Sequence, residues 1–154
     1  MLDRLNDILP RFLLAMAMAL VLAGLSGTAR ADELVTVEGA WSRALPPVVK
    51  VGAAYLKVSN AGAAGVVVIG AAASIAERAE LHEHTHVDGM MRMRQVARVE
   101  VPAGATVSFE PHGLHVMLFG LREPLKAGSQ YQLTLRFASG REITSTVQVK
   151  KQTP

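Results

Sequence analysis

Residues 130–137 have the sequence QYQLTLRF, residues 142–149 have the sequence EITSTVQV, and Ser139-Gly140 lies between them. In both stretches polar and apolar residues alternate, which is the two-residue repeat of a β-strand with one buried face. The glycine favours a turn at the junction because it accepts a positive φ. This stretch therefore predicts two strands joined by a turn near the end of the chain.

Similar short strand patterns, separated by Gly, Pro and Asn turns, extend back to residue 34. The expected strands are Leu34–Val37, Ala54–Val58, Val66–Ile69, Ala79–His84, Met91–Val96, Thr106–Phe109, Leu114–Phe119, Gln130–Phe137 and Glu142–Val149. Only the Ala-rich segment 71–79 has weak helical periodicity. These short strands predict an all-β sandwich or barrel, and nine of them in this length fit a two-sheet Greek-key β-sandwich of the immunoglobulin-like type. We expect Trp41 and Tyr55 to anchor its core.

The N-terminal residues have the pattern of a targeting segment. Two arginines precede an apolar run, Phe12–Leu25, and the small-x-small sequence Ala29-Arg30-Ala31 follows it. The run is shorter than the roughly twenty residues that a transmembrane helix needs. We predict that residues 1–31 are a cleaved secretory signal peptide and that residues 32–154 form one domain, exported to the periplasm without stable membrane insertion.

The composition excludes several classes of function. The chain has 16 Lys and Arg, 13 Asp and Glu, and no Cys. Residues 1–31 hold three of the basic and two of the acidic residues, so the predicted domain has a net charge of +2. The 5% aromatic content argues against nucleic acid as a partner, and the charge excess is too small to support an argument. Without Cys, a metal has to be bound by His, Met or carboxylate.

Histidine and methionine gather in one segment of the predicted domain. All its His and Met residues lie between positions 82 and 117, namely His82, His84, His86, Met90, Met91, Met93, His112, His115 and Met117. Residues two apart on a strand share a face, with Cα atoms about 6.5 Å apart. His115 and Met117 can therefore converge on one ion.

The ligand types indicate the metal. Thioether sulfur is a soft ligand and imidazole is borderline, so a His and Met mixture favours Cu(I) over Mg²⁺ or Ca²⁺. Cleavage after residue 31 would leave Asp32 at the N-terminus, so the amino-terminal His chelate of copper monooxygenases would be absent. We therefore expect a protein that carries copper, not an enzyme.

The spacing of four of these residues resembles a family signature. His82, ten residues, Met93, twenty-one residues and then His115-Val116-Met117 resemble the signature of the periplasmic copper chaperone PCuAC family. Further similar segments are Ala40–Ala44, Gly52–Tyr55, Gly89–Arg94, Val101–Gly104 and Gly113–Leu118. The resemblance implies a cupredoxin-like β-sandwich with His82, Met93, His115 and Met117 as copper ligands.

The same resemblance implies a role and partners. Copper would be delivered to the dinuclear copper centre of a haem–copper oxidase, in oxidase subunit II, with participation of a Sco-like thiol protein. The carrier would act as a monomer and bind Cu(I) in preference to Cu(II).

Two alternatives stay open from the residues alone. His84 and His86 are candidate auxiliary ligands, and together with His82 they would suit a periplasmic buffer for Cu(II) or Zn²⁺ that does not depend on Met. The three histidines also fit an exposed strand face beside Glu80 and Glu83, in a metal-free immunoglobulin-like interaction module.

Overall fold

Ten β-strands form in the residues that this computed structural model describes, 34–87 and 89–151. The strands are β1 (Val35–Arg43), β2 (Val51–Asn60), β3 (Val66–Ala73), β4 (Ala76–Val87), β5 (Met90–Gln95), β6 (Val99–Val101), β7 (Thr106–Phe109), β8 (Leu114–Leu121), β9 (Gln130–Phe137) and β10 (Glu142–Lys150). Within these residues no helix has the length and apolarity to cross a membrane. The predicted signal peptide lies outside the described residues.

Hydrogen bonds join the strands into one sheet. Its order is β5-β4-β8-β2-β1-β10-β9-β3-β6, and β7 pairs with β2 beside this path. A further pairing of β3 with β4, at Ala71 and Ala79, brings the sheet back onto itself in a barrel-like closure. The all-β prediction is confirmed. The finer prediction, a two-sheet Greek-key sandwich, is not confirmed, because these pairings connect the strands continuously.

The two-residue repeat that predicted the C-terminal strands also builds the core. On β9, Leu133, Leu135 and Phe137 are at most 2% exposed, while the residues between them face outward or are half-buried. β10 pairs antiparallel with β9, and Gly140 in the intervening turn has a φ of 87°. Burial of such side chains is the main favourable contribution to folding.

The structure differs from the sequence analysis in two details. The three-residue strand β6 was missed because it is too short to show a repeat. The weak helical periodicity of segment 71–79 forms no helix, since residues 71–73 belong to β3 and residues 76–79 to β4, which pair with β9 and β8. Trp41 and Tyr55 are half-buried and pack on each other with ring centroids 4.7 Å apart, outside the fully buried core.

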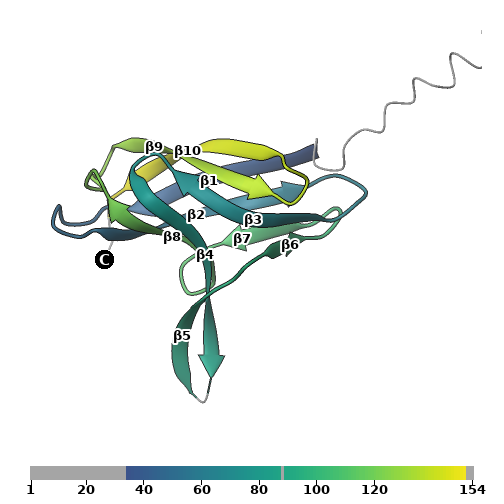
Figure 1. The fold of residues 1–154 in the computed structure, drawn as a ribbon, viewed down its shortest axis with the longest axis horizontal. Helices are drawn as coiled ribbons and strands as arrows, with labels where there is room; N and C mark the ends of the chain where they lie inside the picture. The colour runs from purple at the N-terminus through teal and green to yellow at the C-terminus, as the bar shows by residue number, and fades with distance from the viewer. Residues whose placement is uncertain (1–33, 88, 152–154) are drawn as a thin grey trace, which may run out of the picture. The chain divides into compact units, whose positions relative to one another are not determined.

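Strand β4 is shared between the closed sheet and a projecting hairpin (Figure 1). Residues 76–83 of β4 pair with β8, whereas residues 82–87 pair with β5. All six residues of β5 are exposed, because β5 has β4 as its neighbour and ends the strand order. The β4–β5 hairpin therefore presents both of its faces outside the closed sheet.

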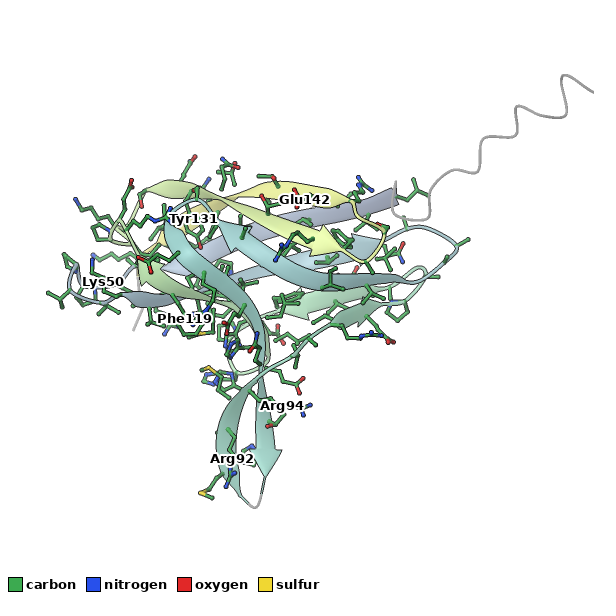
Figure 2. The ribbon with its side chains drawn as sticks, viewed as in Figure 1. Lys50, Arg92, Arg94, Phe119, Tyr131 and Glu142 are labelled. Atoms are coloured by element: carbon green, nitrogen blue, oxygen red, sulfur yellow. The ribbon has the colours of Figure 1, made fainter. Side chains whose placement is uncertain are left out.

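A buried hydroxyl pair links β1 to β9 inside the fold. Ser42 donates from Oγ to the Ala53 carbonyl oxygen at 2.8 Å, so the Tyr131 hydroxyl is the donor in its 2.6 Å contact with Ser42 Oγ. Burial raises the pKa of Tyr131 to about 12. Tyr131 is labelled in Figure 2.

This pair predicts an alkaline loss of stability. The unfolded tyrosine ionises near its ordinary pKa of 10.0, whereas the folded side chain keeps its proton up to about 12. The stability contributed by Tyr131 is therefore fully present below pH 10 and is lost as the pH rises through about 12. Urea unfolding should show about 1 kcal/mol more loss between pH 9 and pH 11 in the parent than in Tyr131→Phe. Equal losses in the two proteins would contradict this assignment.

Candidate metal centre

The pairing of β4 with β8 places two predicted ligands side by side. His82 lies opposite His115, and Glu80 lies opposite Met117. Side chains of residues directly opposite each other in an antiparallel pair lie on the same face. Leu81 alternates with them and points into the core, where it is 3% exposed. His82, His115 and Met117 consequently share the outer face.

The pairing of β4 with β5 extends this face onto the hairpin. His84 lies opposite Met93, and His86 lies opposite Met91. Met93 is 48% exposed and His86 is also exposed. The four residues of the predicted ligand set therefore come from three adjacent strands and occupy one face, and the auxiliary candidates His84 and His86 continue it toward the hairpin turn.

Three imidazole rings form the buried part of the centre. The ring centroid of His115 lies 4.9 Å from that of His84 and 6.0 Å from that of His82. His115 is 2% exposed although it lies on the outer face. Burial lowers the pKa of His115, the hydrogen bond to the Gly113 carbonyl opposes this, and repulsion from His84 and His82 lowers the pKa further. His115 is therefore held in its neutral, metal-binding form.

Each of the three rings has a buried nitrogen without a hydrogen-bond partner among the described residues. These atoms are His82 Nδ1, His84 Nδ1 and His115 Nε2. A buried polar atom left unpaired costs about 1–3 kcal/mol, so such atoms are uncommon in a folded protein. A soft or borderline metal ion bound by these nitrogens would satisfy them.

Hydrogen bonds at the other ring nitrogens fix where the lone pairs lie. His115 Nδ1 is 3.0 Å from the Gly113 carbonyl oxygen, which only accepts, so this nitrogen carries the proton. His82 Nε2 is 2.9 Å from the Glu80 carboxylate and donates to it in the same way. In the neutral rings the lone pairs therefore lie on His115 Nε2 and His82 Nδ1, the nitrogens without partners.

Glu80 orients His82, and a stacked arginine orients Glu80 in turn. Arg78 Nε contacts the Glu80 carboxylate at 2.6 Å, and the Arg78 guanidinium lies 4.7 Å from the ring centroid of Phe119, labelled in Figure 2. The hydrogen bond from His82 lowers the pKa of Glu80, burial opposes this, and the charge of Arg78 lowers the pKa further. The sequence analysis did not assign Glu80 this role, although its position two residues before His82 on a strand already places both on one face.

The turn before β8 holds a fourth imidazole near the centre. His112 has a φ of 68°, in the left-handed region that few residues other than glycine adopt. Its ring centroid lies 6.1 Å from that of His84, and the side chain is exposed. His112 thus lies at the rim, next to a residue of the buried cluster.

Imidazoles and carboxylates alone do not enclose an ion in this conformation. Within the described ranges, no group of three or more His, Cys, Asp or Glu side chains is arranged to hold a metal ion. The register places the thioethers of Met93 and Met117 on the same face as these imidazoles.

Comparison with known proteins assigns the family. The family model described as "LpqE-like: Putative lipoprotein LpqE-like" matches residues 35–149. The chain belongs to the LpqE-like family. A member of similar length, the "Putative lipoprotein Lxx21020" of Leifsonia xyli subsp. xyli, is 34% identical over 152 residues, which cover 91% of this chain and 90% of that protein.

Solved structures share the fold of this LpqE-like chain. The solution structure of CuI-DR1885 from Deinococcus radiodurans is 34% identical, with a TM-score of 0.64, and the match covers 84% of this chain and 87% of that one. The copper-bound PCuAC domain from PmoF2 is 20% identical with a TM-score of 0.64, over 77% of this chain and 94% of that domain. At 20% identity, the likeness to the PCuAC domain shows a shared fold.

The hydrogen bonds in the centre predict two different tautomers. At slightly alkaline pH, His115 should be the Nδ1–H tautomer and His82 the Nε2–H tautomer. Long-range ¹H–¹⁵N correlation spectra of the metal-free protein distinguish the two forms. In Glu80→Ala, His82 should no longer prefer the Nε2–H tautomer, while His115 should still prefer the Nδ1–H tautomer. An Nε2–H tautomer at His115 would contradict the placement of its lone pair.

Proposed function

We propose that this LpqE-like protein is an exported metallochaperone that binds Cu(I) through His82, Met93, His115 and Met117. Three buried imidazole nitrogens without partners, next to two thioethers on the same face, are the observation that carries the proposal. Two neutral nitrogen and two neutral sulfur donors match the preference of Cu(I) for soft and borderline ligands. The relative DR1885, solved in a CuI form and 34% identical to this chain, supports the same assignment.

The unequal exposure of the donors suits temporary binding. His115 is 2% exposed and is fixed by the Gly113 carbonyl, so it would act as the constant anchor. Met93 is 48% exposed on the projecting hairpin, so an incoming ligand from an acceptor protein can replace it first. Stepwise replacement of ligands lets the ion leave without unfolding of the closed sheet.

The acceptor follows from the resemblance to PCuAC proteins. The proposed destination is the dinuclear copper centre in subunit II of a haem–copper oxidase, with a Sco-like thiol protein as a further partner and the periplasm as the compartment. The predicted signal peptide and the lipoprotein description of the family support export. No residue is assigned a catalytic role, and the carrier is proposed to be a monomer.

One observation favours a second candidate, a buffer for Cu(II) or Zn²⁺. His84 lies closer to His115 than His82 does, and His84 Nδ1 is also unpaired. Three imidazoles would suit either divalent ion. This alternative differs from the chaperone in one respect that experiment can test, because it does not need Met93 or Met117.

Replacing both thioethers tests the ligand set. Met93→Leu combined with Met117→Leu should weaken Cu(I) binding at least about 100-fold with little effect on folding, since leucine conserves volume and apolarity. Anaerobic competition with a water-soluble Cu(I) chelator measures the affinity, and X-ray absorption of the loaded parent should show two sulfur ligands.

Met90 provides the matched control for this experiment. It lies on β5 like Met93 and is 55% exposed, but the strand repeat places it on the opposite face. Met90→Leu should bind Cu(I) as the parent does. If the double variant also binds as the parent does, the four-ligand site is wrong and the imidazole buffer becomes the better account.

The proposed ligands also predict the pH dependence of copper binding. A bound imidazole has to be neutral, whereas a thioether has no proton to lose. Copper binding depresses the pKa of each ligand histidine, so copper-derived stability is fully present above the ordinary imidazole pKa of about 6.5 and is lost as the pH falls through the bound-state values. The Cu(I) affinity should fall by at most two powers of ten per pH unit, one for each histidine.

Thermal unfolding of loaded and metal-free protein over a series of acidic pH values measures this dependence. A copper-induced stabilisation that does not change with pH would mean that His82 and His115 are not both ligands. A slope above two protons would add His84 to the set.

A further inference from the structure

The two faces of the β4–β5 hairpin carry different side chains, charged and polar residues on one face and histidine and methionine on the other. On one face Arg94 Nε donates to Glu83 at 2.7 Å, and the Thr85 hydroxyl donates to the Arg92 carbonyl oxygen at 3.4 Å. Both arginines are labelled in Figure 2, on the projecting part of the molecule. This polar face is a solvated surface held by an ion pair.

Two cross-strand pairs of a histidine and a methionine lie on the opposite face of the hairpin. His84 lies opposite Met93 in the proposed copper centre, and His86 lies opposite Met91 one repeat further out. Cross-strand neighbours have Cβ atoms about 4.5–5.5 Å apart, which is close enough for an imidazole nitrogen and a thioether sulfur to bind one ion. The hairpin therefore repeats half of the copper centre beyond it.

The imidazoles become more covered from the outer pair inward. His86 is exposed, His84 is half-buried and His115 is 2% exposed. The two thioethers do not differ in this way, because Met91 is 49% and Met93 is 48% exposed. Successive pairs along the hairpin lie about 6.5–7 Å apart. A row of exposed thioethers thus leads from the hairpin turn toward the buried imidazoles.

We propose that His86 and Met91 form an outer Cu(I) site through which the ion enters and leaves the copper centre. The inference rests on the proposed function, since it needs Cu(I) to be the ion carried. Transfer exchanges ligands: a bond from copper to Met93 forms as a bond to Met91 or His86 breaks. Copper stays at +1 and no electron moves, because the step only replaces one ligand by another.

Such a site should be weak and should affect rates. It has two donors instead of four, and both lie in water, so its affinity is below that of the centre. Its loss would leave the equilibrium affinity of the centre unchanged but would remove a step on the exchange route. The rate of copper exchange therefore separates the outer site from the ligand set of the centre.

Anaerobic stopped-flow transfer of Cu(I) from the loaded full-length chain to an excess of chelator measures that rate. Met91→Leu should slow transfer about tenfold or more while the equilibrium affinity stays within about twofold of the parent, a difference of less than 1 kcal/mol. Met90→Leu, on the neighbouring residue of the opposite face, should change neither quantity. An unchanged transfer rate in Met91→Leu would overturn the proposal.

Methionine methyl spectra with Ag(I), a soft monovalent probe without redox chemistry, locate the second ion. The first equivalent should shift the ¹³C-methyl signals of Met93 and Met117, and the signal of Met91 should shift with the second equivalent, while Met90 stays in place. If Met91 shifts together with Met93 in the first equivalent, it is a ligand of the centre and the outer site is wrong. If Met93→Leu with Met117→Leu keeps full affinity, the proposed function fails instead, so the two failures are distinguishable.

Discussion

The hydrogen bonding of β4 to two different partners sets the geometry of the candidate centre. At His82 the two pairings overlap, because this residue lies opposite His115 on β8 and opposite Gln95 on β5. Strand alternation then places Leu81 in the core and the imidazoles outside. A shift of the register by one residue would move His82 to the inner face and expose Leu81, so hydrophobic burial also fixes the face on which His82 and His115 lie.

Hydrogen bonds fix the orientation of two imidazoles in the candidate centre. Glu80 and the Gly113 carbonyl each occupy one nitrogen of a ring, and Arg78 balances the carboxylate from its far side. The nitrogens left over are buried and unpaired. Burying these nitrogens without a hydrogen-bond partner costs free energy, and a bound ion would remove that cost. None of the proposed ligands carries a negative charge, which would favour harder divalent ions.

The sequence was sufficient to predict the features that follow from the two-residue repeat of a single strand. Alternation predicted the strands of the C-terminal hairpin and the shared faces of His82 with His84 and of Met91 with Met93, and the registers agree. It was not sufficient for what depends on distant pairing. The opposition of His82 and His115, the closure through Ala71 and Ala79, and the extension of β4 beyond the closed sheet all come from contacts between segments remote in the chain. Residue types alone carry no information on these pairings.

Because the β4–β5 hairpin projects from the closed sheet, an ion bound at the candidate centre would change the stiffness of the hairpin. An ion bound to Met93 on β5 and to His115 on β8 would cross-link two residues that have twenty-one residues of sequence between them and lie on strands that do not pair with each other. In a chain without Cys, this link would restrict the unfolded chain as a disulfide does, yet would be reversible at constant oxidation state. Loading would then stiffen the hairpin, and release would loosen it, so that a partner able to distinguish a stiff hairpin from a loose one could tell a full carrier from an empty one.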